Sequence, residues 1–283
     1  MDTTDPLHWE QNFLLSSDRH HDNPHADHAL EERHLNQVVE RNAGWLDGGD
    51  LSCLMAGRYD PRRARVGVMR PEHADAPDYI DSVVEAAAKF YGRPEWARRC
   101  VFLSRGNHEQ SILKNNDTDV VARIAERMTM LSGHRVRTSG YGGFVKFVVR
   151  IRKQTHTLTL AHFHGSGGGG MMTFDTLRVR RQASFVDADI LWCGHVHERW
   201  WLETAKYELR SEKGLYRVGL TPIHHVRSGC YKAEGDDYYG GWATERGMPP
   251  KPLGAVWMRL FFTHETENAR RGWRLRCEFK ATD

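Results

Sequence analysis

The sequence predicts a single α/β domain with two β-sheets, and three observations lead to this class. Short apolar runs typical of buried strands alternate with stretches of helical periodicity in the first two thirds of the chain. From Trp200 onward the chain is strand-rich, with turns that contain Gly, Pro or charged residues. No internal repeat or linker divides the 283 residues, which are enough for one sizeable core.

Each element follows from a local pattern. The run Phe13–Leu15 predicts a buried strand that delivers Asp18 at its end, and a weaker strand covers Gly44–Leu46. Apolar residues at helical spacing predict a helix over about His28–Asn42, with Gly44 as a stop signal. The other predicted helices cover about 79–91, 118–131 and 172–185, and the other predicted strands cover 100–103, 144–151, 155–161, 190–193, 216–220, 223–226, 256–262 and 273–279.

Composition indicates a cytoplasmic protein without a membrane partner. The hydrophobic content of 40% and the charged content of 27% are ordinary for globular proteins. No apolar run reaches the roughly 18–20 residues of a membrane helix, and the acidic N-terminus does not resemble a secretory signal. Five scattered cysteines without a C-x-x-C pair favour a reducing compartment. The net charge of +3 is too small to imply a nucleic-acid partner by itself, and the oligomeric state is open.

Five short polar stretches, most of them after a predicted strand, carry carboxylate, amide and imidazole side chains. These donors suit Mn²⁺, Fe or Zn²⁺ better than Ca²⁺. Together they predict two divalent ions about 3.5–4 Å apart. The stretches are Asp18-Arg19-His20, Gly49-Asp50, Gly106-Asn107-His108-Glu109, His164-Gly165 and Gly194-His195-Val196-His197.

The first two stretches supply carboxylates. Asp18 and His20 are two residues apart, so an extended backbone would point both at one ion. Asp50 follows a glycine, and we expect two ions to share its carboxylate. The alternative role for Asp50 is to cap a helix over about 51–57, and the two roles are compatible.

The third stretch is the most specific. Asn107 is a neutral amide ligand, and the neighbouring His108 lies within reach of a substrate as a proton donor. We expect Glu109 to orient its neighbours or the start of a helix rather than to bind metal.

The remaining histidines divide into ligands and others. His164 is favoured over His162 because a glycine follows it, and His162 is a candidate for an outer contact or a substrate contact. His195 and His197 are expected on one side of an extended turn after a rigid strand. The Gly167–Gly170 run is interpreted as a mobile turn, with a phosphate-binding nest as the alternative. We expect four further histidines to be solvated, namely His21, His25, His28 and His34.

Asn107 follows Asp50 by 57 positions, a distance longer than one helix and one strand need. We interpret about 55–98 as an insertion next to the metal centre, where substrate selection is common. Arginine can clamp phosphate oxygens and stack on bases, so Arg58 and Arg105 are candidate substrate contacts. A solvated loop paired to local acids is an equal alternative. The arginines of the stretch are Arg58, Arg62, Arg63, Arg65 and Arg70.

The ordered set Asp-x-His, Gly-Asp, Gly-Asn-His-Glu, His-Gly and Gly-His-x-His closely resembles the calcineurin-like metallophosphoesterase superfamily, over residues 18–197. The resemblance implies a four-layer α/β/β/α sandwich, with two mixed sheets flanked by helices and a binuclear centre at the strand ends. It implies one ion held by Asp18, His20, Asp50 and His197, and another held by Asp50, Asn107, His164 and His195. It also implies that His108 stands near the leaving group.

The stretch Arg105-Gly106-Asn107-His108-Glu109 also resembles the corresponding motif of the serine/threonine protein phosphatases, but the first two motifs depart from that family. These enzymes carry Gly-Asp-x-His-Gly at the first motif, where this chain has Ser17-Asp18-Arg19-His20-His21. They also carry a second Asp and an Arg after the second motif, and neither follows Asp50 at that spacing. We therefore do not expect protein-phosphatase specificity.

The leading hypothesis is a metal-dependent hydrolase of phosphate esters that contains two divalent ions. Mn²⁺ is the expected metal, and Fe, Zn²⁺ and Ni²⁺ are alternatives. A phosphodiester substrate such as nucleic acid or a nucleotide is favoured, with a phosphomonoesterase on a small molecule or a phosphoprotein as the alternative.

Two further hypotheses belong to different functional classes. The chain could be a non-catalytic metal-bound module, although no motif residue is lost in the way expected of a degenerate relative. It could also be an enzyme that serves as one subunit of a larger assembly. In that case the strand-rich part at about 200–283, with Trp242, Trp257 and Trp273, would offer an interface.

Overall fold

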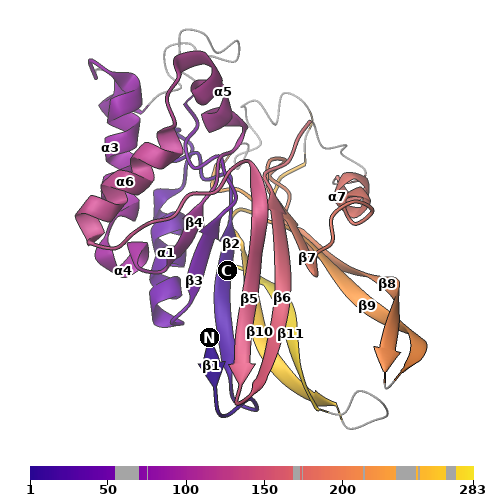
Figure 1. Cartoon of the computed structure of the whole chain (residues 1–283). Helices are drawn as coiled ribbons and strands as arrows, with labels where there is room; N and C mark the ends of the chain where they lie inside the picture. Colours follow the sequence, from indigo (N-terminus) through magenta and orange to yellow (C-terminus); the bar gives the residue numbers. More distant parts are fainter. Residues whose placement is uncertain are drawn as a thin grey trace.

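The computed structural model is a mixed α/β protein with two mixed sheets and helices (Figure 1). It describes residues 1–54, 70–74, 76–167, 173, 175–212, 214–233, 247, 249–265 and 272–283. Within these ranges no helix is long and apolar enough to cross a membrane.

One sheet carries the first three motif-bearing strands. Its order is β11-β10-β2-β3-β4. Strands β2, β3 and β4 are parallel, whereas β10 is antiparallel to both β2 and β11. The carboxyl ends of β2, β3 and β4 therefore meet at one edge of the sheet. The strands are β2 (Glu10–Ser16), β3 (Gly44–Asp47), β4 (Cys100–Leu103), β10 (Val256–Glu265) and β11 (Gly272–Ala281).

The other sheet has the order β1-β5-β6-β7-β9-β8. Strands β6, β7 and β9 are parallel, and the hairpins β5–β6 and β8–β9 are antiparallel. The carboxyl ends of β6 and β7 deliver the last two motifs. The strands are β1 (Asp2–Thr3), β5 (Gly142–Ile151), β6 (Gln154–Phe163), β7 (Ile190–Cys193), β8 (Trp200–Glu212) and β9 (Leu215–Arg227).

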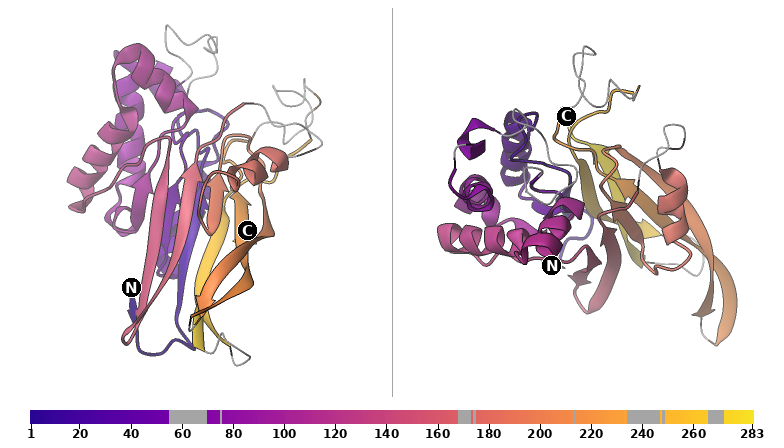
Figure 2. Two further views of the ribbon diagram at one scale, coloured as in Figure 1. Left: turned by 45° about the vertical axis from the view of Figure 1, so that its right-hand side comes forward. Right: turned by 90° about the horizontal axis from the view of Figure 1, so that it is seen from above.

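Most helices gather beside the β2-β3-β4 sheet, and α7 lies beyond the other sheet (Figure 2). Asp27, Asp78 and Asp119 begin three of these helices by accepting hydrogen bonds from backbone N–H groups of the first turn, an arrangement that stabilises a helix start. The helices are α1 (His28–Glu40), α2 (Pro71–Ala74), α3 (Tyr79–Tyr91), α4 (Pro94–Ala97), α5 (Asn107–Asn116), α6 (Val120–Ser132) and α7 (Thr176–Gln182).

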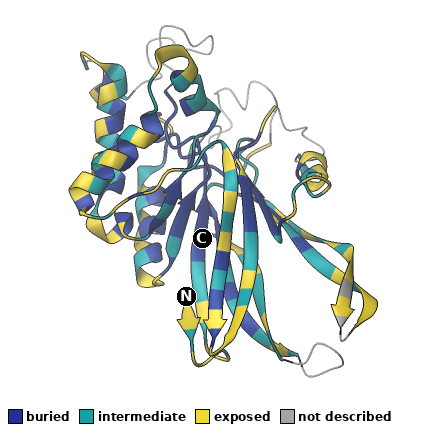
Figure 3. Ribbon diagram, in the orientation of Figure 1, coloured by how far each residue is buried: buried dark blue, intermediate teal, exposed yellow. Residues whose placement is uncertain are grey.

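The central strands are buried on both faces, which explains their continuous apolar runs (Figure 3). In β2, Leu14 packs toward the helices, whereas Phe13 and Leu15 face the layer between the two sheets. Trp192 of β7 lies in that same layer, and Leu191 packs on the opposite side, near the chain that follows α7. Because successive side chains of a strand point to opposite faces, each sheet contributes to the apolar layers on both of its sides.

Most of the predicted elements are confirmed. The strands over 100–103 and 190–193 and the helix over 79–91 have the predicted bounds, whereas the helix expected over 172–185 covers only Thr176–Gln182 within the described residues. Gly44 does not follow the first helix as a stop signal but begins β3. Residues 55–69 of the stretch interpreted as an insertion lie outside the described residues. Helices α3 and α4, in the rest of this stretch, pack into the hydrophobic core on the helix side of the sheet.

The expectation that His21 and His34 are solvated is wrong, because both side chains are buried. His34 Nδ1 lies 3.0 Å from the Tyr231 hydroxyl, and its Nε2 lies 3.2 Å from the carbonyl oxygen of Asp283. Burial lowers the pKa of His34 to about 4, so the imidazole is neutral in the folded protein near neutral pH. His28 is partly buried and His25 is exposed.

We predict that His34 makes the fold sensitive to mild acid. An unfolded histidine gains its proton near pH 6.5, whereas folded His34 stays neutral down to about pH 4. The unfolded state therefore binds more protons in this window, and the free energy of unfolding decreases as the pH falls, by at most about 1.4 kcal/mol per pH unit. His34→Gln should flatten this slope in urea unfolding between pH 4 and 6.5. His25→Gln, at an exposed position, is the matched control; equal slopes in wild type and His34→Gln would contradict the prediction.

Candidate metal centre

The seven predicted ligands converge where the carboxyl ends of strands from both sheets meet. The loops after β2, β3 and β4 bring Asp18, His20, Asp50 and Asn107, and the loops after β6 and β7 bring His164, His195 and His197. Their donor atoms form two groups. One contains Asp18, His20 and His197, and the other contains Asp50, His164 and His195, with Asn107 beside it.

In the first group three donor atoms face one another. His197 Nε2 lies 3.2 Å from His20 Nε2 and 3.5 Å from Asp18 Oδ1. Asp18 Oδ2 accepts a hydrogen bond from the backbone N–H of His195 at 2.8 Å. One carboxylate oxygen thus holds the loop from the other sheet, while the second oxygen points at the two imidazoles.

In the second group the donor atoms of four side chains lie close together. His164 Nε2 lies 3.1 Å from Asp50 Oδ2 and 3.1 Å from Asn107 Oδ1. His195 Nδ1 lies 2.7 Å from the same amide oxygen of Asn107. All of these atoms are oxygens or imidazole nitrogens, the donor types that first-row divalent metals bind.

The hydrogen bonds on the far side of the rings set which nitrogen can bind a cation. His164 Nδ1 lies 2.9 Å from the carbonyl oxygen of Gly48, and His195 Nε2 lies 3.0 Å from the carbonyl oxygen of Gly167. Carbonyl oxygens only accept, so these nitrogens carry the protons. When either ring is neutral, its remaining nitrogen presents a lone pair to the oxygens of Asp50 or Asn107.

Oxygens that face imidazole nitrogens in this way attract a positive charge, either a proton or a metal ion. Among the described residues, Asp18 Oδ1 and His20 Nδ1 are buried without a hydrogen-bond partner. Burial opposes charge on His164, yet Asp50 raises the pKa of His164 to about 9. Despite their burial, the nearby imidazoles hold the pKa of Asp18 and the pKa of Asp50 below their ordinary values. The two buried carboxylates thus attract positive charge, and divalent ions fit this donor set.

The ligand loops are not extended, which corrects the expectation for the first and last motifs. Asp18 and His20 have φ of 52° and 48°, and His195 and His197 have φ of 77° and 58°. Asp50 is also left-handed, with φ of 55°. Left-handed backbone costs non-glycine residues about 1–3 kcal/mol each and persists only where the surroundings impose it. Five of the seven predicted ligands carry this strain, a pattern that is typical of functional sites.

Glycine is required where the loops of Asp50 and Asn107 meet. A Cβ on Gly106 would lie 2.0 Å from Asp50 Oδ1, and one on Gly49 would lie 2.6 Å from the backbone nitrogen of Gly106. Gly49 also has a φ of +104°, which disfavours any side chain. The Gly-Asp and Gly-Asn pairs therefore allow two backbones to approach each other around one carboxylate.

Glu109 orients this junction, as the sequence predicts. Its carboxylate is buried and accepts from the backbone N–H groups of Asp50 (3.1 Å), Ser52 (2.8 Å) and Gly106 (2.8 Å). The alternative role of Asp50 as the cap of a helix over 51–57 is not borne out through residue 54, where the chain is not helical. Asp50 Oδ1 instead accepts from the backbone N–H of His108 at 2.9 Å.

Arg19, which lies between two predicted ligands, is fully buried and anchors the first loop. Its guanidinium pairs with Asp47 at 3.1 Å and with Glu31 at 3.4 Å, and it donates to Ser16 Oγ at 2.9 Å. It also lies 4.7–5.4 Å from the ring centres of three aromatic residues, Trp45, Tyr91 and Tyr231. The buried His21 joins the same network, 3.4 Å from Glu31 Oε1. A charged side chain in this position fixes the backbone on either side of it.

The other candidate residues lie in different surroundings. His162 faces away from the centre, with its nitrogens 3.3 Å from Ser104 Oγ and 3.0 Å from Ser139 Oγ. Arg105 is partly exposed and pairs with Asp119 at 3.4 Å. Arg58 lies outside the described residues, as do positions 168–170 of the glycine run. The structure therefore places His164, and not His162, beside Asp50.

Sequence reasoning missed two residues next to the centre. Cys53 lies beside His20 and His108, and its carbonyl oxygen accepts a hydrogen bond from His108 Nδ1. Arg227 is buried at the end of β9 and donates to the carbonyl oxygen of Gly194, which fixes the loop of His195. No local pattern marks either residue, because both roles depend on contacts with distant parts of the chain.

Comparisons with known proteins add little to this geometry. No family model and no curated protein matches the sequence. One similar solved structure is an NMR structure of a Thermotoga maritima protein, with a TM-score of 0.33 and 14% identity, covering 96% of this chain and 99% of that one. Another is GAP50, the anchor in the inner membrane complex of Plasmodium, with a TM-score of 0.44 and 8% identity, covering 96% of this chain and 84% of that one.

We predict that Arg19→Met strongly destabilises the protein. The substitution leaves Asp47 and Glu31 buried without their cation, which typically costs about 3–5 kcal/mol. Arg150→Met is the control, because the ion pair of Arg150 with Asp2 is exposed and such pairs contribute about 0–1 kcal/mol. Urea unfolding measures both; a loss below about 1 kcal/mol for Arg19→Met would mean that the network does not hold the loop.

Proposed function

We propose that this chain hydrolyses phosphate esters at a centre of two divalent metal ions. The convergence of seven oxygen and imidazole donors into two adjacent groups carries the proposal. The arrangement of most helices beside one sheet and α7 beside the other agrees with the four-layer α/β/β/α sandwich of metallophosphoesterases (Figure 2). That family resemblance was inferred from motif order, and the spatial convergence is an independent reason to favour it.

Each donor group would hold one ion. Asp18, His20 and His197 would hold the first, and Asn107, His164 and His195 would hold the second, with the carboxylate of Asp50 shared between them. Divalent ions held by these residues would supply Lewis-acid polarisation of the phosphoryl oxygens and a water molecule that is nucleophilic near neutral pH. Mn²⁺ suits the mixture of carboxylate, amide and imidazole, and Fe, Zn²⁺ and Ni²⁺ are the alternatives.

His108 is the residue best placed to protonate the leaving group. Its Nδ1 donates to the carbonyl oxygen of Cys53, an acceptor that also stabilises the ring when it is positively charged. Its Nε2 lies 3.8 Å from Asp50 Oδ2, and the side chain retains 11% exposure. The ring can therefore hold a proton at Nε2 beside the substrate and deliver it to the departing oxygen.

The preference for phosphodiesters remains part of the proposal. This preference rests on the Arg-rich stretch at about 55–98, of which residues 55–69 lie outside the described part. Arg70, which is described, donates to the backbone carbonyl oxygens of Asn23 (3.0 Å) and Ala26 (2.9 Å) and so holds the chain after the first motif. Arg58 and Arg105 stay candidates for contacts with the phosphate or the rest of the substrate.

Two chromogenic esters test the activity and its substrate class. The Mn²⁺-loaded protein should cleave bis-p-nitrophenyl phosphate, with much less activity on p-nitrophenyl phosphate. The reverse preference would favour a phosphomonoesterase. Stable binding of two metals per chain without turnover on either ester, on cyclic nucleotides or on single- and double-stranded DNA would favour a non-catalytic module.

We predict that Asp50→Ala removes both activity and most of the bound metal. A shared ligand contributes to both ions, so its loss should reduce metal affinity by more than the roughly 10–100-fold that loss of an outer contact causes. Metal content per chain after dialysis and the rate on bis-p-nitrophenyl phosphate measure the effect. Asp187→Ala, at an exposed position far from the motifs, is the control. Two metals retained by Asp50→Ala would refute the shared role.

We predict that His108→Ala separates chemistry from metal binding. The variant should keep its metal content but lose about 10²–10⁴-fold in rate on alkyl phosphoesters, whose leaving groups need a proton. On nitrophenyl esters the loss should be much smaller, because nitrophenolate departs without one. Metal loss would make His108 a ligand, and an equal loss on both ester types would assign it to phosphate positioning.

A further inference from the structure

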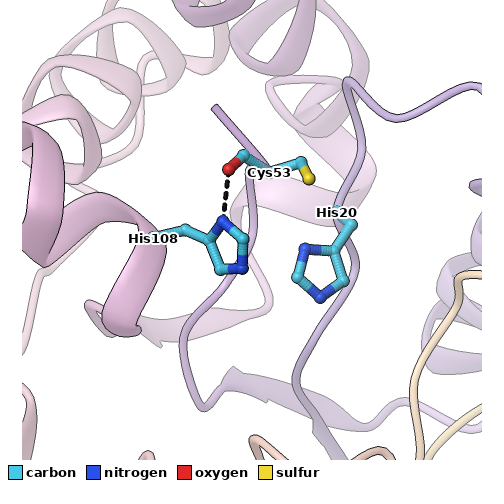
Figure 4. Close-up of side chains that lie close together, drawn as sticks. All are labelled: His20, Cys53 and His108. Carbon is cyan, nitrogen blue, oxygen red and sulfur yellow. Dashed lines mark hydrogen bonds between the residues drawn. The ribbon is translucent and has the colours of Figure 1, made fainter. Parts of the chain in front are cut away.

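A third group of potential ligands adjoins the centre and is not explained by the proposed hydrolysis. His20, Cys53 and His108 each offer one donor atom, and these three atoms lie within 4.8 Å of one another. Figure 4 shows the Cys53 sulfur and the two imidazole rings facing a common space. This group includes a sulfur among its donors, whereas the two donor groups of the centre consist of oxygens and nitrogens.

The His20 ring has one nitrogen for each group. Its Nε2 faces His197 at 3.2 Å, within the first donor group of the centre. His20 is only 2% exposed, and its Nδ1 is buried without a hydrogen-bond partner among the described residues. A buried nitrogen without a partner is costly, and a bound ligand would remove the cost.

The other two members are held rigidly in place. His108 Nδ1 donates to the carbonyl oxygen of Cys53, so its Nε2 is the nitrogen that remains to face His20. The His20 and His108 rings are 5.0 Å apart, edge to face. Asp22 accepts from the backbone N–H groups of Cys53 and Leu54, which fixes the residue that carries the thiol.

The sulfur also has a polar neighbour. Asn23, itself buried, donates from Nδ2 to Cys53 Sγ at 3.5 Å. Burial raises the pKa of the Cys53 thiol to about 12, and the hydrogen bond from Asn23 opposes this rise. A cation must therefore displace the thiol proton when it binds. An outer contact such as that of Asn23 is typical of the residues that surround metal ligands.

One thiolate and two imidazoles are the donors of Zn²⁺ and similar thiophilic ions. We propose that His20, Cys53 and His108 form a third, inhibitory site for a thiophilic cation such as Zn²⁺ or Cd²⁺. Binding forms a metal–sulfur bond, and the thiol proton is released to solvent. Donor atoms around tetrahedral zinc lie about 3.3–3.8 Å apart. The three donor atoms lie within 4.8 Å of one another, so they would have to approach by at most about 1.5 Å.

The inhibitory part rests on the proposed function. An ion at this site occupies Nε2 of His108, which can then no longer hold a proton for a leaving group. It also competes for His20, because a neutral imidazole has only one lone pair and the first donor group of the centre requires it at Nε2. Metal binding at the third site is independent of any activity and can be measured alone.

Titration with Cd²⁺ tests the binding. Cadmium bound to a thiolate gives a charge-transfer band in the ultraviolet that oxygen and nitrogen ligands do not produce. The Mn²⁺-loaded protein should gain this band with one cadmium per chain, and Cys53→Ser and Cys53→Ala should lack it. Cys277→Ser, at a partly exposed cysteine in β11, should keep it. His108→Ala should bind cadmium at least tenfold more weakly. A band that persists in both Cys53 variants, or its absence from the wild type, would overturn the site.

Ester hydrolysis in the same titration tests the inhibition. Cd²⁺ should inhibit the Mn²⁺-loaded wild type and Cys277→Ser at concentrations at least tenfold below those that inhibit Cys53→Ser, each relative to its own rate. Equal sensitivity would mean that cadmium acts at the two-metal centre, and the inhibitory role would be wrong. A protein that shows the cadmium band but hydrolyses no ester would contradict the proposed function while leaving the third site intact.

Discussion

The buried guanidinium of Arg19 is the interaction on which the rest of the site depends. It joins the loop after β2, the end of β3 and helix α1, through Asp47 and Glu31, in a space enclosed by aromatic rings. An isolated buried charge would be prohibitive, so all three segments must be in place before the arginine can be buried. Arg227 has the corresponding position below the loop after β7, where it donates to Gly194. Each sheet therefore has one arginine that fixes a ligand loop from the side away from the ligands.

This anchoring explains how the ligand loops keep an unfavourable backbone. Asp18, His20, Asp50, His195 and His197 are all left-handed, and each costs about 1–3 kcal/mol. Such conformations point successive side chains in directions that neither a strand nor a helix provides. Here they allow Asp18 and His20, two residues apart in one motif, to contribute to the same donor group. The stability of the surrounding layers offsets the strain, and the layers are large because the strands are buried on both faces.

The sequence predicted much of the fold and the identity of the clustered residues, for separable physical reasons. Buried strands such as β4 and β7 are continuous apolar runs, and the polar residues after them can be recognised without knowledge of contacts. No helix was predicted over the residues of α5, because few of them are buried. The residue before the helix is Gly106, whose N–H donates to Glu109. The burial of His21 and His34 and the left-handed loops were mispredicted for a similar reason. They follow from partners far along the chain, such as Tyr231 beside His34.

Cys53 would have two opposite effects on the proposed hydrolysis. Its carbonyl oxygen orients His108, which requires the residue to lie against the site, and its side chain then brings a sulfur toward two imidazoles. A serine or alanine would keep the carbonyl and remove the soft donor, so the orientation of His108 does not explain the thiol. Hard carboxylate and amide oxygens would favour Mn²⁺ in the proposed two-metal centre, whereas sulfur would favour Zn²⁺ and heavier ions. The proposed two-metal centre and the third site share His20 but prefer different metals. The activity would therefore depend on which metals are present as well as on their concentrations.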